Sequence, residues 1–162
     1  MSSDRIEKEV VLRAPLERVW RAISDADQFG QWFGVRFDGP FVEGTSVTGV
    51  ITPTTVDEDV ARMQEPHAGT ADTWHIVAVE PQRRLAFRWH PYPVEAGGEP
   101  EPTTLVEFTL TETDGGVLLR IVESGFDKIP AERRAAAFEG NSQGWAKQTE
   151  LVGKYLALSE QV

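Results

Sequence analysis

The sequence lacks cysteine altogether, which excludes disulfide bonds and thiolate chemistry. Histidine is scarce, and His67, His75 and His90 do not lie in a spacing typical of zinc ligands. Glycine forms neither of the two common patterns that cradle a nucleotide phosphate. We therefore expect no metal and no cofactor.

Positive charge is also in short supply. The chain has 16 Lys and Arg against 26 Asp and Glu, which gives a net charge of −10. A nucleic-acid partner would need basic patches that neutralise phosphates, so none is expected. No apolar run approaches bilayer length, and the N-terminal M-S-S-D-R-I-E-K-E carries no apolar signal region. These absences predict a protein that does not insert into membranes, with the cytoplasm as its default location.

The length of 162 residues predicts one domain, 1–162, with a single core. Helical spacing of apolar residues indicates a short helix at Val19, Trp20 and Ile23, and a second one at Phe29, Trp32 and Phe33. A long terminal helix is expected over 130–158. Alternating apolar positions predict strands over 6–13, 35–37, 45–52, 73–80, 85–90, 103–112 and 117–124.

Two segments interrupt this periodicity. Residues 53–71 have no regular pattern, and loops of that length are usually functional or mobile. The segment P-Y-P-V-E-A-G-G-E-P-E-P that starts at Pro91 carries four prolines and cannot be the interior of a strand. We expect both segments to be loops that control access to a site, the first of them as a flap.

Strand parity maps the inner face of the sheet, because alternate side chains point to the same side. Glu123 is in phase with Leu119 and Ile121, so its carboxylate is expected to point inward. It could then act as an acid, a base or an anchor for a ligand. Alternatively, it pairs with a basic side chain at the strand end and has no chemical role.

Several segments together resemble a known superfamily. They are A-P-L-E-R-V-W-R-A-I-S-D, F-G-Q-W-F, E-P-Q-R-R-L-A-F-R-W, L-L-R-I-V-E-S-G-F and G-W-A-K-Q-T-E-L-V-G-K-Y-L. In this order they resemble the Bet v 1-like or START-like (SRPBCC) superfamily, and within it the family related to the C-terminal domain of the activator of the Hsp90 ATPase. The resemblance implies an α+β helix-grip fold. A curved antiparallel sheet of about seven strands would surround a long C-terminal helix, with two short helices near the N-terminus.

Members of this superfamily are carriers, cyclases, stress-response proteins and a co-chaperone domain, so the resemblance implies architecture more than activity. Members often have His where this chain has Glu123, and a mechanism that depends on imidazole there would not transfer. The favoured hypothesis is a non-enzymatic carrier or stress-response protein that binds a hydrophobic small molecule between the sheet and the terminal helix. The residues predicted to contact that molecule are Trp32, Phe87, Trp89, Ile121, Glu123, Trp145, Gln148, Thr149 and Val152.

Two alternatives remain open. In the first, the protein is a cyclase-like or hydrolase-like enzyme in which Glu123 or His75 moves a proton, although a histidine at the surface is the more common case. In the second, it is an interaction protein similar to the Hsp90 activator, with a chaperone as its partner. A homodimer is compatible with either, because sheet edges and the terminal helix offer surfaces for pairing.

Overall fold

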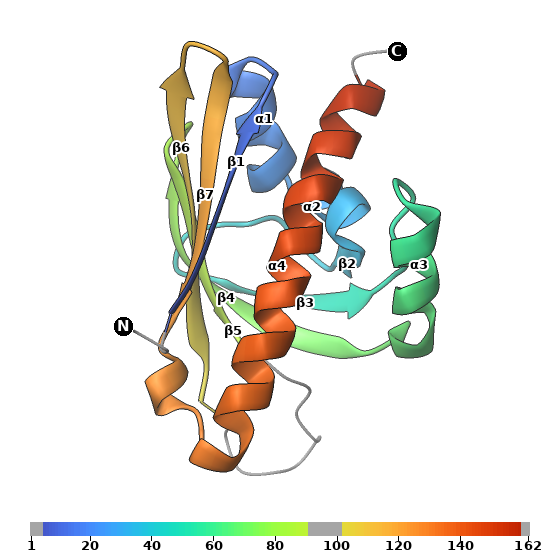
Figure 1. Ribbon diagram of the computed structural model, residues 1–162, viewed down its shortest axis with the longest axis vertical. Helices are drawn as coiled ribbons and strands as arrows, with labels where there is room; N and C mark the ends of the chain where they lie inside the picture. The colour runs from blue at the N-terminus through green and yellow to red at the C-terminus, as the bar shows by residue number, and fades with distance from the viewer. Residues whose placement is uncertain (1–4, 91–101, 160–162) are drawn as a thin grey trace.

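The computed structural model describes residues 5–90 and 102–159. Seven strands form one antiparallel sheet in the order β1-β7-β6-β5-β4-β3-β2 (Figure 1). The strands are β1 (Arg5–Leu12), β2 (Val35–Phe37), β3 (Ser46–Ile51), β4 (Ala71–Glu80), β5 (Arg84–Trp89), β6 (Thr104–Thr113) and β7 (Gly116–Ser124). The strand boundaries agree with the alternation in the sequence to within one or two residues.

The sheet curves around the long helix α4 (Ala131–Ser159), which runs beside β1 and β7 (Figure 1). Two short helices, α1 (Leu16–Ser24) and α2 (Ala26–Phe33), connect β1 to β2. The predicted α+β helix-grip fold is therefore confirmed in its sheet, its terminal helix and its two N-terminal helices. None of the helices within the described residues is long and apolar enough to cross a membrane.

The corner between α1 and α2 is set by Asp25. Its carboxylate accepts hydrogen bonds from the backbone N–H groups of Asp27 and Gln28, at 2.9 and 3.1 Å, and so caps α2. Gly34 ends α2 with a φ of 93°, a left-handed conformation that other residues rarely adopt. This stop turns the chain into β2 and leaves the side chain of Phe33 at the last position of the helix.

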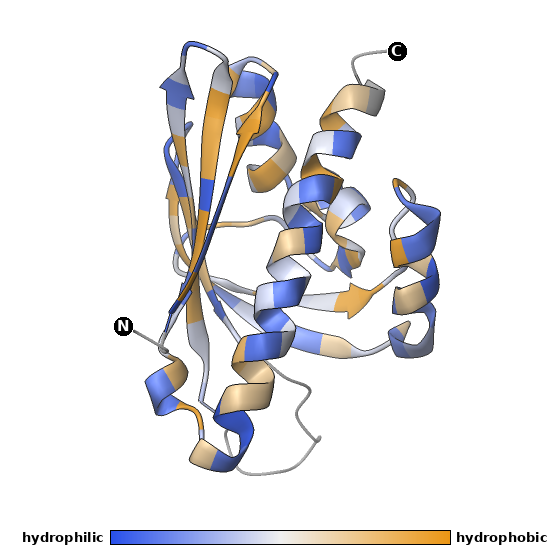
Figure 2. Cartoon of the chain, in the orientation of Figure 1, coloured by the Kyte–Doolittle hydropathy of each residue, from blue (hydrophilic) through white to orange (hydrophobic). Residues whose placement is uncertain are grey.

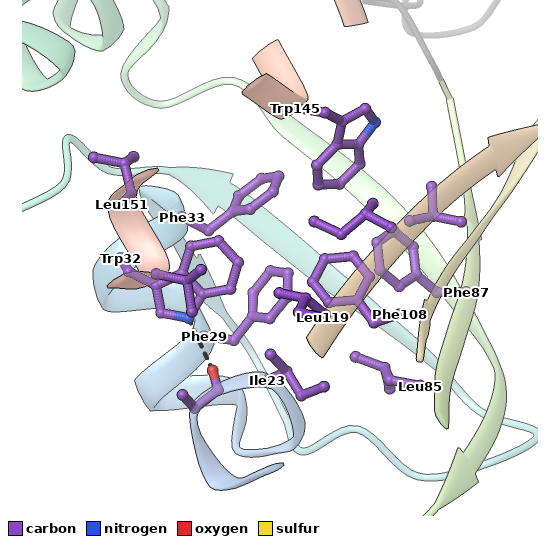
Figure 3. Close-up of a cluster of buried hydrophobic side chains, with 14 of the residues drawn as sticks. Ile23, Phe29, Trp32, Phe33, Leu85, Phe87, Phe108, Leu119, Trp145 and Leu151 are labelled. Atoms are coloured by element: carbon purple, nitrogen blue, oxygen red, sulfur yellow. Dashed lines mark hydrogen bonds between the residues drawn. The ribbon is translucent and has the colours of Figure 1, made fainter. Parts of the chain in front are cut away.

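Hydrophobic residues recur along the strands and the short N-terminal helices (Figure 2), and apolar side chains cluster between the sheet and the helices (Figure 3). Phe29 from α2, Phe87 from β5 and Phe108 from β6 are completely buried, and the Phe29 ring lies 5.8 Å from that of Phe108, centroid to centroid. Trp145 comes from α4 and lies at the border of this cluster (Figure 3). Packed aromatic side chains therefore cover much of the concave face of the sheet.

The segment 53–71 is not the irregular loop that the sequence predicts. It contains the helix α3 (Glu58–Gln64) and the 3-10 helix η1 (Glu65–His67). Asp57 caps α3 by accepting from the N–H groups of Asp59 and Val60, at 2.9 and 3.1 Å. The helix escaped prediction because it is short and buries only Val60, so its sequence has no apolar periodicity.

Side-chain contacts attach α3 to the rest of the molecule. Gln64 accepts a hydrogen bond from the Thr54 N–H at 2.8 Å and donates one to the carbonyl of Phe33 at 3.0 Å. Asp57 forms an ion pair with Lys154 on α4. A role of this segment as a flap stays a prediction. The proline-rich segment that begins at Pro91 lies outside the described residues up to residue 101, so its predicted role is also open.

Candidate functional site

The inner face of β7 carries one acidic residue among apolar ones. Glu123 lies two residues after Ile121, and its side chain is completely buried. Its neighbours across the sheet are Ile6 on β1 and Val106 on β6. The prediction that parity turns this carboxylate inward is confirmed.

Four neutral groups donate hydrogen bonds to the Glu123 carboxylate. Oε2 accepts from Trp89 Nε1 at 2.7 Å and from Thr104 Oγ1 at 2.5 Å. Oε1 accepts from Trp145 Nε1 at 2.8 Å. The side-chain amide of Asn141 donates to both oxygens, at 3.0 and 3.1 Å. Each oxygen of the carboxyl group therefore has at least two hydrogen-bond partners.

Glu123 has no cationic partner within 5–90 and 102–159, where none of the ion pairs includes it. The expected alternative, in which it pairs with a basic side chain at the strand end, is therefore wrong for this part of the chain. Its side chain is held by hydrogen bonds with neutral groups.

The sheet register and one turn of α4 bring these donors together. Trp89 at the end of β5 lies opposite Thr104 at the start of β6, and the next inward position of β6, Val106, lies opposite Glu123. Asn141 and Trp145 are four residues apart on α4 and therefore share one face of the helix. Three strands and the helix thus converge on one carboxylate.

A small cavity borders this network. It has a volume of about 70 Å³ and is lined by Phe33, Trp89, Asn141, Gly144, Trp145 and Gln148; we call it the Trp89–Trp145 cavity. Since a water molecule occupies about 30 Å³ in the liquid, the space suits two waters or one small head group. It is too small to enclose an entire hydrophobic molecule without movement of side chains.

Aromatic rings and two amide side chains define the character of this cavity. The ring centroids of Phe33, Trp89 and Trp145 lie 5.5 to 6.0 Å from one another. Gln148 donates from Nε2 to the carbonyl of Phe33 at 3.2 Å. Its Oε1 is almost inaccessible to solvent and accepts no hydrogen bond from the described residues, so it does not face the open space of the cavity. The walls are therefore mostly aromatic, with the side chains of Asn141 and Gln148 as their polar part.

Four of the predicted ligand contacts meet here: Trp89, Trp145 and Gln148 line the cavity, and Glu123 lies behind the two indoles. The others do not line it. Trp32, Phe87, Ile121 and Val152 are fully buried in the hydrophobic core. A contact between these core residues and a ligand stays a prediction.

Two of the predicted polar side chains already have partners. The hydroxyl of Thr149 donates to the carbonyl of Ala146 in its own helix at 2.8 Å, so it is not turned toward the cavity. The indole of Trp32 donates to the carbonyl of Ala22 at 2.8 Å (Figure 3). Both bonds satisfy local backbone groups, which is the more common use of such side chains.

Sequence reasoning missed Phe33, Thr104 and Gly144 as members of the site. Thr104 could have been found, because it shares the inward parity of Val106 and Phe108. Phe33 and Gly144 carry no comparable signal, since their positions at the cavity depend on how α2 and α4 pack.

The histidines are not part of this site. His75 is exposed on β4, where its Nδ1 lies 3.2 Å from the hydroxyl of Ser46, so it cannot act on a ligand in the cavity. His90 pairs through Nδ1 with Asp72 at 2.7 Å. Within the described residues no group of three His, Asp or Glu side chains could hold a metal ion.

A curved seven-stranded antiparallel sheet closed around a C-terminal helix defines the helix-grip class of the Bet v 1-like superfamily. The chain belongs to the family described as activator of Hsp90 ATPase homolog 1-like protein, whose model matches residues 13–157. No curated protein matches the sequence.

Solved structures share this fold at low sequence identity. Protein MLL2253 from Mesorhizobium loti is 24% identical with a TM-score of 0.70, over 94% of this chain and 96% of that one. Protein Ms6760 from Mycobacterium smegmatis is 19% identical with a TM-score of 0.71, over 97% and 93% of the two chains. DynU16, from the dynemicin biosynthetic locus, is 24% identical with a TM-score of 0.67, over 95% of this chain and 47% of its own. At these identities the likeness establishes the fold alone.

Proposed function

We propose that this protein binds a small, largely apolar molecule whose polar end enters the Trp89–Trp145 cavity. The observation that carries the proposal is a cavity walled mostly by the rings of Phe33, Trp89 and Trp145, with the side chains of Asn141 and Gln148 as its polar part. Aromatic walls with few polar groups are typical of small-molecule sites.

The volume of the cavity decides how such a molecule would be held. About 70 Å³ accommodates a head group, so the apolar remainder would lie against Phe33 and Trp89 at the mouth. Binding would then gain from burial of apolar surface at about 25 cal/mol per Å², before the costs of association. A carrier or stress-response role is compatible with this mode of binding.

The enzymatic alternative has less support. Among the described residues the Glu123 carboxyl group is hydrogen-bonded to four protein side chains, and Glu123 is not among the residues that line the cavity. A general base must reach the proton that it removes. A chaperone partner, as in the Hsp90 activator, rests on the family alone. The exposed large apolar residues among those described are Val11, Val42, Met63 and Val77.

Gly144 allows a direct test of the site. A Cβ at Gly144 or at Gly140, one turn earlier on α4, would meet nothing within 4 Å, so both positions accept a larger side chain. Gly144→Leu should fill the mouth of the cavity, whereas Gly140→Leu is the matched control outside it. Replacing glycine inside a helix also favours folding by about 1 kcal/mol.

The measurement is native mass spectrometry of the protein from its own host, followed by extraction of bound compounds. We expect a small molecule on the wild type and on Gly140→Leu, and its loss from Gly144→Leu. A compound that Gly144→Leu retains at the same occupancy would place its binding elsewhere and contradict the proposal.

A further inference from the structure

The side-chain nitrogens of the residues that line the Trp89–Trp145 cavity all donate within the protein. The indole nitrogens of Trp89 and Trp145 donate to the two carboxyl oxygens of Glu123, at 2.7 and 2.8 Å. Nδ2 of Asn141 donates to the same two oxygens, at 3.0 and 3.1 Å. Nε2 of Gln148 donates to a backbone carbonyl at 3.2 Å. The polar side chains of the wall are therefore held by their nitrogen ends.

Two amide oxygens remain at this wall, and they differ in their access to solvent. Oε1 of Gln148 is almost inaccessible, so a molecule in the cavity does not reach it. Oδ1 of Asn141 accepts no hydrogen bond from the described residues either, but it is not closed off from solvent. Reversing this amide would place Oδ1 against two oxygens that already accept from the indoles. Oδ1 is therefore the end of Asn141 that is left for the cavity that this residue lines.

We infer that the polar end of the ligand is a neutral hydroxyl and that Asn141 Oδ1 accepts its hydrogen bond. A hydroxyl has a single hydrogen to donate, which matches a wall with one accessible side-chain oxygen among its lining residues. An ether has no hydrogen to donate and would cover Oδ1 without satisfying it. An ammonium brings three N–H groups and a charge that must be desolvated. This inference rests on the proposed function and specifies its ligand class.

Three compounds with the same number of non-hydrogen atoms test the head group: hexan-1-ol, its isomer 1-methoxypentane, and hexylammonium. At about pH 7 the amine is protonated. Binding would be followed through the indole N–H signals of Trp89 and Trp145 in the ¹⁵N-labelled protein, assigned with Trp→Phe variants. We expect hexan-1-ol to bind roughly fivefold more tightly than 1-methoxypentane, and hexylammonium to bind more weakly than the alcohol.

Asn141→Ala connects this ranking to its cause. It removes Oδ1, so the alcohol and the ether should then bind within about twofold of each other. Because the change also takes a donor from Glu123 and could destabilise the protein, the wild type supplies a second measurement. The signal of the side-chain carbonyl carbon of Asn141 should lie farther downfield with hexan-1-ol bound than with 1-methoxypentane bound. The same carbon of Gln143, an exposed amide on α4 that donates to Glu139, is the control and should not distinguish the two.

The possible outcomes separate the two proposals. Equal affinities for the alcohol and the ether, or a preference for the ether or the ammonium, would overturn the hydroxyl and leave small-molecule binding intact. A preference for the alcohol without a difference at the Asn141 carbonyl carbon would overturn Asn141 as the acceptor. Failure of all three compounds to shift the two indole signals would overturn binding at this cavity, and the ligand class with it. The expected ranking in the wild type, with no binding to Gly144→Leu, would support both proposals.

Discussion

Trp145 on α4 donates a 2.8 Å hydrogen bond from its indole nitrogen to Oε1 of Glu123 on β7, and this bond joins the terminal helix to the sheet. The residues are 22 positions apart, and both are almost completely buried. Together with the bond from Trp89, it makes one carboxylate the shared acceptor of the helix and the sheet. We therefore expect the attachment of α4 to the sheet to depend on the carboxyl group of Glu123.

Glu123→Leu should strongly destabilise the protein. Leucine keeps most of the volume but leaves the donors of Trp89, Thr104, Asn141 and Trp145 without an acceptor. We expect the free energy of unfolding to fall by roughly 3–5 kcal/mol, because each stranded buried donor is costly. Urea unfolding would measure it. Glu112→Leu at the exposed end of β6 is the control, expected to change stability by about 0.5 kcal/mol or less. A loss below about 1 kcal/mol would show that the donors find other partners.

Trp145→Phe should cost more than Trp32→Phe. Both changes remove an indole N–H, but Trp145 donates to the side-chain carboxyl group of Glu123, whereas Trp32 donates to the backbone carbonyl of Ala22. Hydrogen bonds to charged groups contribute about 1.5–3 kcal/mol and neutral ones about 0.5–1.5 kcal/mol. The comparison by urea unfolding cancels most of the packing loss that the two variants share. Equal losses would show that the bond to Glu123 is no stronger than a hydrogen bond to a backbone carbonyl.

The ion pair between Asp57 and Lys154 should make part of the stability depend on pH. The hydrogen bond from Lys154, followed by the N–H group of Val60, lowers the pKa of Asp57 below its usual 3.8. A lowered pKa in the folded state stabilises the protein above pH 3.8, and this contribution disappears as the pH falls through the folded-state value.

Asp57→Asn isolates this contribution, because asparagine caps a helix about as well as aspartate but carries no charge. We expect a lower melting temperature at neutral pH and a smaller loss of stability below about pH 4 than in the wild type. Thermal unfolding across pH 2.5–7 would measure both, with Glu112→Gln as the exposed control. Parallel curves for wild type and Asp57→Asn would mean that the pair with Lys154 contributes nothing measurable.

Gln64 should hold α3 against the body of the protein. Its amide joins the Thr54 N–H to the carbonyl of Phe33, so Gln64→Met removes both bonds at a similar side-chain length. We expect faster hydrogen exchange at the amides of α3, by roughly five- to thirty-fold, for a loss of about 1–2 kcal/mol of local stability. Met63→Ala at the exposed neighbouring position is the control. Unchanged hydrogen exchange in Gln64→Met would show that the Asp57–Lys154 pair and Val60 are enough to hold α3 in place.

Local patterns in the sequence determined much of the fold. Alternation located the strands because one face of each is buried, and it placed Glu123 on the inner face with Ile121. The same rule did not reveal α3, because a short helix that buries only Val60 leaves no periodic trace. Its position depends on single side-chain contacts from Asp57 and Gln64, which a local pattern cannot show.

The same distinction between local pattern and tertiary contact applies to the candidate site. By itself, the sequence determined that Glu123 is inward-facing and that aromatic residues are abundant near it, because side-chain direction follows from backbone periodicity. Only the tertiary structure decided that Trp89, Thr104, Asn141 and Trp145 all donate to that carboxylate, and that Phe87 and Trp32 fill the core. The reason is physical: these relations depend on the register across β5, β6 and β7 and on the packing of α4, and both are fixed by contacts between residues distant in sequence.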